Sequence, residues 1–234
     1  SYTIKDGEIK LNDPTSEPTG YTFDGWYNGE EKVTTIPAGS YGNLTLTACW
    51  KANSVSVTFE LGDGLEKTDG DAEATFGQSY TFTLTAKSGY SRPATVTVTV
   101  GEQTYRVAVG AGGAVVIPPV YVTDDITITA VGVADSYTIV FVGGESVTGA
   151  MNNQTVLYNI QTKLTANGFV RLGYTFLGWA YTSGAGVSIK NEGSVKIDEN
   201  FEGVIEGTTI TLHAVWSPIE YTLKLEANGG NFTE

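Results

Sequence analysis

Cysteine and histidine are almost missing from this sequence, which holds one of each, Cys49 and His213. A single cysteine cannot form an intramolecular disulfide, and a single histidine cannot build a multi-histidine metal site. No serine or cysteine has a suitably spaced histidine partner, which a nucleophile activated by a neighbouring base requires. The sequence therefore predicts no catalytic residue, no metal site and no cofactor.

Basic residues are also scarce, because 13 Lys and Arg face 26 Asp and Glu and leave a net charge of −13. Nucleic acid is excluded as an expected partner, since its binding relies on clustered Lys and Arg. Anionic membrane surfaces are disfavoured for the same reason. No apolar run approaches the ~18 residues that span a bilayer, so no direct membrane insertion is expected. No signal peptide opens the chain and a strand-like sequence begins at Ser1, so we interpret the chain as an excised or processed fragment.

The residues that are abundant point to a mainly β fold. Hydrophobic residues make up 41% of the chain, charged residues only 17%, and 29 glycines interrupt it at short intervals. Few stretches are long enough for a helix between these breaks. Threonine supplies much of the polar surface, and it serves the outward face of a strand without weakening that strand.

One motif occurs twice in the chain. Gly20–Trp26 (GYTFDGW) returns as Gly173–Trp179 (GYTFLGW), and each copy is closed by a strand that ends in Trp50 or Trp216. The distance between the two Trp residues differs, with 24 positions from 26 to 50 and 37 from 179 to 216. A variable segment between constant ends is typical of a surface loop within a repeated module.

The repeated residues predict a small aromatic core in each copy. In the closing strand, Leu44, Leu46, Ala48 and Trp50 alternate with polar or small residues and fall on one face. The glycine before each first Trp predicts a bulge or a close backbone approach. The predicted core residues of the two copies are Tyr21, Phe23, Gly25, Trp26 and Trp50, and Tyr174, Phe176, Gly178, Trp179 and Trp216.

At these residues the sequence resembles the Listeria–Bacteroides repeat, or internalin B-repeat. The second copy matches the whole family pattern, with an opening strand at Tyr137–Phe141, a turn at Gly143–Gly144, the motif, and a closing strand at Leu212–Trp216. The resemblance implies a β-grasp-like module, strung in tandem on bacterial surface and secreted proteins. It implies an extracellular location, at the cell surface or cell wall, and it carries no catalytic residues. A near-absence of cysteine is common among secreted proteins of Gram-positive bacteria.

The segment between the copies predicts a β-sandwich of immunoglobulin-like type. Its alternating runs lie at Val55–Leu61, Tyr80–Ala86, Ala94–Val100, Tyr105–Val109, Ala114–Ile117 and Ile126–Val131. The predicted organisation has four segments. These are a repeat copy without its first strand (1–51), the sandwich (52–134), a complete repeat (135–218) and the opening strand of a further repeat (219–234).

The tail supports a hypothesis about partners. Tyr221–Leu225, with Asn228–Gly230, resembles the opening of a repeat, whereas the first copy lacks such an opening. Residues 221–230 are therefore expected to pair with the Ser1–Trp50 module of another molecule by head-to-tail strand exchange. Neighbouring repeats of the same polypeptide are the other expected partners.

Three functions remain open from the sequence. The leading one is a non-catalytic stalk or spacer segment of a bacterial cell-surface protein, with adhesion as an open role. The alternative is a module that binds carbohydrate or a host protein, and the remote alternative is an accessory region of a secreted glycoside-processing enzyme, because 26 acidic residues could supply paired carboxylates. The residues that motivate the binding alternative are Tyr90, Tyr105, Tyr121 and Tyr181.

A calcium site and an internal cross-link also stay open from the sequence. An acidic Gly-rich stretch offers oxygen ligands of the type that Ca²⁺ prefers, although its spacing matches no full EF-hand and hairpin turns use the same residues. An intramolecular Lys–Asn isopeptide bond would need a buried lysine beside an asparagine and an acid. The acidic residues of the Gly-rich stretch, which could bind Ca²⁺, are Glu60, Asp63, Glu66, Asp69, Asp71 and Glu73.

Overall fold

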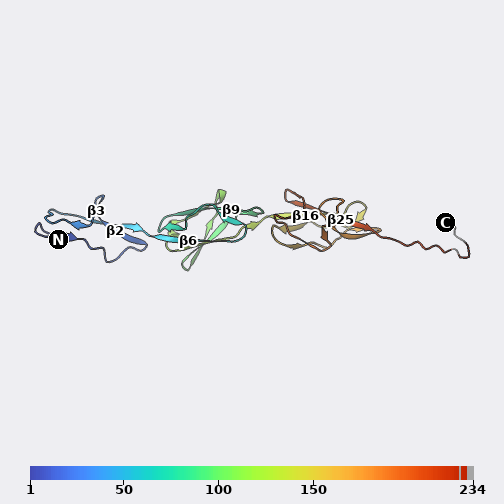
Figure 1. Ribbon diagram of the computed structural model, residues 1–234, viewed down its shortest axis with the longest axis horizontal. Coiled ribbons are helices and arrows are strands. Elements are labelled where there is room, and N and C mark those ends of the chain that lie inside the picture. Colours follow the sequence, from blue (N-terminus) through green and yellow to red (C-terminus); the bar gives the residue numbers. More distant parts are fainter. Residues whose placement is uncertain (227, 231–234) are drawn as a thin grey trace. The chain divides into compact units, whose positions relative to one another are not determined.

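The computed structural model describes residues 1–226 and 228–230, and strands dominate it (Figure 1). The contacts within the chain divide it into two compact units, Ser1–Val133 and Ala134–Glu234. The mainly β fold class is confirmed, with two short 3₁₀ turns at Ala111–Gly113 and Pro119–Tyr121. Across the described residues there is no helix long and apolar enough to cross a membrane. The boundaries of the four predicted segments stay a prediction.

The first repeat forms a small three-stranded sheet at the start of the first unit. Its order is β3-β2-β5, and both neighbours run antiparallel to β2. A separate two-stranded pair joins β1 to β4. The bounds are β1 (Ile9–Lys10), β2 (Tyr21–Asn28), β3 (Glu31–Val33), β4 (Thr35–Ile36) and β5 (Thr47–Ala52).

The sandwich completes the first unit with two sheets around one core. The larger sheet has the order β12-β11-β14-β6-β8 and the smaller one β13-β9-β7, and β14 runs parallel to β6. Alternating residues fill the space between them, including Phe82, Leu84, Val98 and Ile128. The strands are β6 (Ser54–Leu61), β7 (Leu65–Lys67), β8 (Glu73–Thr75), β9 (Tyr80–Ala86), β10 (Tyr90–Ser91), β11 (Thr95–Val100), β12 (Gln103–Ala108), β13 (Ala114–Ile117), β14 (Ile126–Ala130) and β15 (Val133–Ala134).

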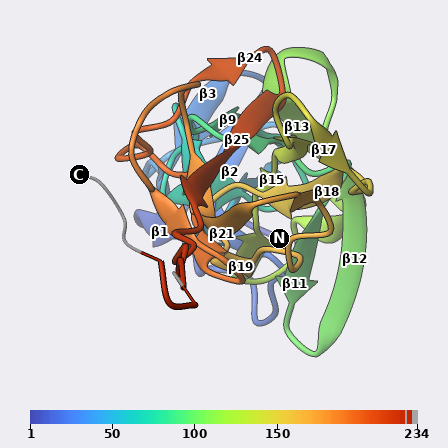
Figure 2. The same ribbon diagram turned by 90° about the vertical axis from the view of Figure 1, so that its right-hand side faces the viewer.

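The second unit holds the complete repeat. Its main sheet has the order β18-β16-β25-β21-β22, and β24 pairs with the start of β25. β21 pairs antiparallel with one edge of β25 (Figure 2). β16 pairs with the other edge of β25 and runs parallel to it. The main strands are β16 (Ser136–Val142), β18 (Gln154–Leu157), β21 (Tyr174–Ala180), β22 (Ile189–Lys190), β24 (Ile205–Glu206) and β25 (Thr209–Pro218).

Parallel first and last strands at the centre of a mixed sheet are the arrangement expected of a β-grasp-like module. The segment between β18 and β21 carries no helix and instead holds two short strands. These two short strands are β19 (Thr162–Lys163) and β20 (Val170–Arg171). Each forms a pair outside the main sheet, β20 with β17 (Val147–Thr148) and β19 with β23 (Ser194–Val195). The pair β19–β23 corresponds to β1–β4 in the first repeat, so the copies share this part of their architecture.

The tail that follows β25 forms no strand over 219–226. The amide of Ile219 donates to the carbonyl of Gly173, and Lys224 forms an ion pair with Glu226 at 2.7 Å. The predicted strand exchange with a second molecule stays a prediction.

Two neighbours on β13 test the sandwich core. Val115 is fully buried, whereas the side chain of Val116 is 54% exposed on the opposite face of the same strand. We expect Val115→Ala to lower the free energy of unfolding by about 2 kcal/mol, since it removes two buried methyl groups and leaves a cavity. Val116→Ala is the matched control and should change it by less than about 0.5 kcal/mol. Urea unfolding followed by circular dichroism measures both, and equal effects would contradict the assigned faces.

Candidate functional site

A glycine bulge positions the aromatic residues in each repeat. The pairing of β2 with β5 shifts between Phe23 and Gly25, and that of β21 with β25 shifts between Phe176 and Gly178. The two glycines have φ values of +156° and +154°, which side-chain-bearing residues avoid. A β-bulge bends its strand and re-aims the following side chain. The bulge therefore turns the next residue, a Trp in both copies, toward its sheet's apolar face.

Close packing adds a second reason for glycine at the bulge. A Cβ atom at Gly178 would lie 2.5 Å from the carbonyl oxygen of Ile189, so the backbone itself leaves no room. At Gly25 it would lie 2.4 Å from Cε of Lys32, a flexible side chain that crosses the glycine. The bulge is thus held more tightly in the second repeat than in the first.

In the second repeat, a phenylalanine lies between two tryptophans, and one of these, Trp179, belongs to the buried apolar cluster of that repeat. The Phe176 ring is 4.9 Å from Trp179 and 5.3 Å from Trp216, both edge-on. Trp179 is fully buried and also contacts Phe141 of β16 at 4.8 Å. The indole nitrogen of Trp216 donates to the carbonyl of Gly143 at 2.9 Å, just beyond β16. The opening strand therefore supplies contacts to both tryptophans.

The first repeat builds the same arrangement but leaves it open. Phe23 lies 5.5 Å from Trp26 and 5.4 Å from Trp50, again edge-on. Both tryptophans are only half-buried, and no hydrophobic side chain of residues 1–50 is buried. The Trp26 indole nitrogen donates to the carbonyl of Asn12 at 3.0 Å. The copies differ because residues 1–50 contain no counterpart of β16.

The tyrosines that open the two motifs take different surroundings. Tyr21 meets Phe76 of the sandwich edge-on at 5.7 Å, so it joins the first repeat to its neighbour within the first unit. Tyr174 instead lies under the guanidinium of Arg171, 4.0 Å from the ring centroid. Both rings are half-buried.

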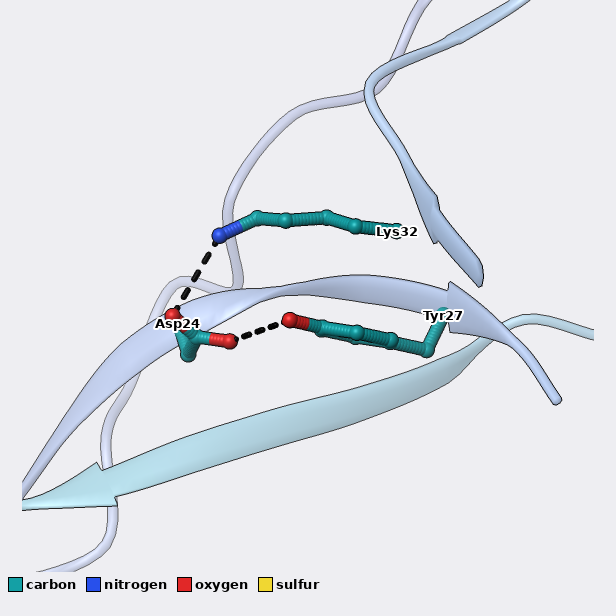
Figure 3. Close-up of polar contacts among 3 residues, drawn as sticks. All are labelled: Asp24, Tyr27 and Lys32. Carbon is teal, nitrogen blue, oxygen red and sulfur yellow. Dashed lines mark hydrogen bonds and ion pairs between the residues drawn. The ribbon is translucent and has the colours of Figure 1, made fainter. Parts of the chain in front are cut away.

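A polar contact on β2 is specific to the first repeat (Figure 3). The Tyr27 hydroxyl donates to one carboxylate oxygen of Asp24 at 2.6 Å, and Lys32 donates to the other at 3.3 Å. These two hydrogen bonds lower the pKa of Asp24, and the hydrogen bond to Asp24 raises the pKa of Tyr27. Leu177 and Ala180 occupy the corresponding positions of the second repeat. The contact ties Lys32 of β3 to Asp24 of β2 across Gly25, and so stabilises this hairpin.

The acidic stretch of the sandwich makes contacts with the residues of β9. Asp69 accepts hydrogen bonds from the amide and hydroxyl of Thr83, and the Asp71 carbonyl accepts one from the Tyr80 hydroxyl. Burial, with the nearby Asp71 and Asp69 charges, raises the pKa of Tyr80 to about 12. Within residues 1–226 and 228–230, no three His, Cys, Asp or Glu residues are grouped so that they could hold a metal ion.

The four tyrosines of the carbohydrate-binding alternative do not gather at one place. Tyr105 and Tyr121 stack on each other with ring centroids 3.9 Å apart, so each covers one face of the other. Tyr90 packs beside Gly64, at another part of the sandwich. Tyr181 lies in the second unit, edge-on to Phe201 at 5.1 Å, and burial raises its pKa. No shared sugar-stacking surface follows from this placement.

The single cysteine and the single histidine belong to different units. Cys49 is half-buried on β5, directly across from Gly25. His213 is half-buried on β25 in the second unit and, with Tyr181 and Glu206, lines a surface hollow of about 290 Å³.

The unequal burial of the tryptophans makes a testable pair. Trp179→Ala should lower the free energy of unfolding of the second repeat by roughly 3–5 kcal/mol, because it empties the centre of that core. Trp26→Ala should cost distinctly less, since half of that core is open. All four tryptophans lie in the repeats, so fluorescence-detected urea unfolding reports on these modules. A larger loss for Trp26→Ala would contradict the assigned difference.

The Asp24 contact predicts a pH dependence. Its carboxyl pKa is lowered in the folded chain, so the contact contributes stability above the unfolded pKa, near 3.9, and loses it as pH falls through the folded pKa. Tyr27→Phe should raise the pKa of Asp24 toward its ordinary value, because the strongest hydrogen bond is gone. Carboxyl-carbon NMR titration measures it, with Tyr41→Phe, an exposed tyrosine, as the control. An unchanged pKa in Tyr27→Phe would contradict the contact.

Comparison with known proteins places both repeats in one family. Residues 2–49 and 137–215 match the Listeria-Bacteroides repeat domain, and together they cover more than half of the 234 residues. No curated protein and no solved structure matches the chain. This repeat family is not a catalytic one, and it is typically found in extracellular bacterial proteins. The chain belongs to the Listeria-Bacteroides repeat domain family.

Proposed function

We propose that this chain is a non-catalytic stalk or spacer segment of a bacterial cell-surface protein, lying outside the cell at the surface or in the cell wall. The observation that carries the proposal is the strand direction within two of its modules. In the sandwich, the first strand β6 and the last full strand β14 are parallel neighbours. In the second repeat, the first strand β16 and the last strand β25 are also parallel neighbours.

Parallel first and last strands decide where the polypeptide enters and leaves each module. The chain enters at the beginning of the first strand and leaves at the end of the last one. Since the two strands point the same way, these points lie at opposite ends of that module's sheet. Modules with opposed ends, joined by short connections, extend a chain in series. A module whose ends lay side by side would instead fold the chain back on itself.

The distribution of polar groups supports the same proposal. No Asp, Glu, Lys, Arg or His side chain is buried in the residues that the structure describes, and Tyr80, whose pKa burial raises, donates its hydroxyl to the backbone carbonyl of Asp71. The polar side-chain contacts of Asp24 in the first repeat and of Asp69 in the sandwich each lie within one module. Each ties neighbouring segments of that module together, which is a structural role.

Small-angle X-ray scattering tests the stalk. A single compact body of this length would have a radius of gyration of about 17 Å, and the unfolded chain would reach about 53 Å. The proposal expects a value of about 25 Å or more together with a folded Kratky profile, because folded modules then follow one another. A urea-unfolded sample is the control for the profile. A folded protein with a radius near 17 Å would overturn the proposal.

A further inference from the structure

A surface hollow of the second repeat has the outer face of β25 on one side. Its volume of about 290 Å³ is at the small end of the range of ligand pockets. Thr209, Thr211 and His213 line it. They alternate along β25 with Ile210 and Leu212, which are fully buried. Because neighbouring residues of a strand point to opposite faces, the three lining residues lie on the face that turns away from the core.

The rest of the lining comes from the segment that joins β21 to β25. Tyr181–Ser183 follow β21 directly, and Glu206 belongs to β24. The pairing of Glu206 with Thr209 sets the carboxylate at one end of the row on β25. The pairing of Ala180 with His213 brings the chain after β21 to the other end. Strand pairing therefore holds an aromatic ring, a carboxylate, hydroxyls and an imidazole around one hollow.

The polar groups of this hollow are not used to hold the module together. Across residues 1–226 and 228–230, no hydrogen bond or ion pair joins the side chains of Glu206, Thr209, Thr211 or His213 to another residue. Asp24 and Asp69, in contrast, are engaged by neighbouring segments. Polar groups that converge on a concave surface with unused hydrogen-bonding capacity are typical of a ligand site.

The chemistry of the hollow is specific to the second repeat. The two copies share their aromatic core motif, but the segment between the tryptophans spans 37 positions in the second repeat and 24 in the first. The ring, the carboxylate and the imidazole all have different counterparts in the first repeat. Counted from the equivalent tryptophans, these counterparts are Asn28, Ser40 and Thr47. A difference confined to the surface of a module whose core is retained is typical of an added binding function.

We propose that this hollow binds one ring of a neutral sugar. The apolar face of the ring packs on Tyr181, and two adjacent sugar hydroxyls donate to the Glu206 carboxylate. The imidazole and the threonine hydroxyls serve the remaining sugar oxygens, because each can donate and accept. Glu206 and the net charge of −13 oppose an anionic ligand, and a hard cation needs more oxygen ligands than one carboxylate supplies.

Sugar binding at this hollow does not rest on the stalk proposal, since it needs only the outer face of one module. It adds to a spacer the capacity to hold a glycan. A single ring in an open hollow loses part of its gain to ordering and desolvation, so we expect a dissociation constant in the millimolar range.

Titration of the full chain with methyl glycosides of glucose, galactose, mannose and N-acetylglucosamine tests the site. Amide NMR spectra should show saturable shifts at residues 181–183, 204–206 and 209–213 with at least one of the four sugars. The uronic acid of the sugar that binds best should bind several-fold more weakly, because its carboxylate meets Glu206. No saturable shift with any of the four, or shifts centred elsewhere, such as at Tyr105, would overturn the proposal.

Substitutions in the hollow test the roles of its side chains. Glu206→Gln keeps the size of the side chain and should raise the dissociation constant about tenfold, because hydrogen bonds to a charged acceptor are the stronger ones. His213→Thr takes the residue of the first repeat and should raise it several-fold. Amide spectra of the free variants show whether each is folded.

Glu192→Gln is the matched control. Glu192 is an exposed carboxylate of the same unit that pairs with Lys163 and does not line the hollow, so its loss should leave sugar affinity unchanged. Equal affinities of the Glu206→Gln and Glu192→Gln variants would contradict the assigned site.

Discussion

The pairing of β16 with β25 is the contact on which the second repeat depends. It places Ile139 and Phe141 beside Ile210 and Leu212 of the closing strand, and Phe141 contacts Trp179, which is fully buried. It also brings Gly143 to the indole nitrogen of Trp216. The first repeat shows what remains without such a strand. Its aromatic rings keep the same mutual geometry, yet Trp26 stays half-exposed where Trp179 is enclosed, and the closing strand is shorter.

The glycine bulge is the second constraint, and it acts within one strand. It appears in both copies with nearly the same φ, although the segments that follow it differ in length. Its neighbours also differ, since a lysine stem crosses Gly25 whereas the backbone of Ile189 approaches Gly178. The bulge therefore belongs to the motif itself, and the contacts around it are what each copy adds. The Asp24 contact with Tyr27 and Lys32 is one such addition.

Much of the fold could be predicted from the sequence because its signals are local. Alternation placed the main sandwich strands within about two residues, and the repeated glycine predicted the bulge. The short strands β7 and β8 were missed, since three residues carry too little alternation. The unequal burial of Trp26 and Trp179 was also missed. Their local sequences are nearly identical, and the difference comes from a strand that lies far away along the chain.

Contacts between residues that are far apart in the sequence could not be predicted from the repeated motif. Pairing between β16 and β25 joins residues about 70 positions apart, and no short pattern records it. The hydrogen bond from Trp216 to Gly143 has the same origin. The stacking of Tyr105 on Tyr121 likewise depends on the way the sandwich closes. Candidate binding residues chosen by type alone were therefore scattered over both units.

The direction of β16 and β25 has a mechanical consequence. A pull on the two ends of this module acts backward on β16 and forward on β25, along the strands themselves. The hydrogen bonds between them are then loaded in shear, so several must break together before the strands slide. In a hairpin pulled from its open end, the bonds would instead break one at a time. The parallel pairing that encloses Trp179 thus also makes the module resist tension along the chain, because several hydrogen bonds must break at once.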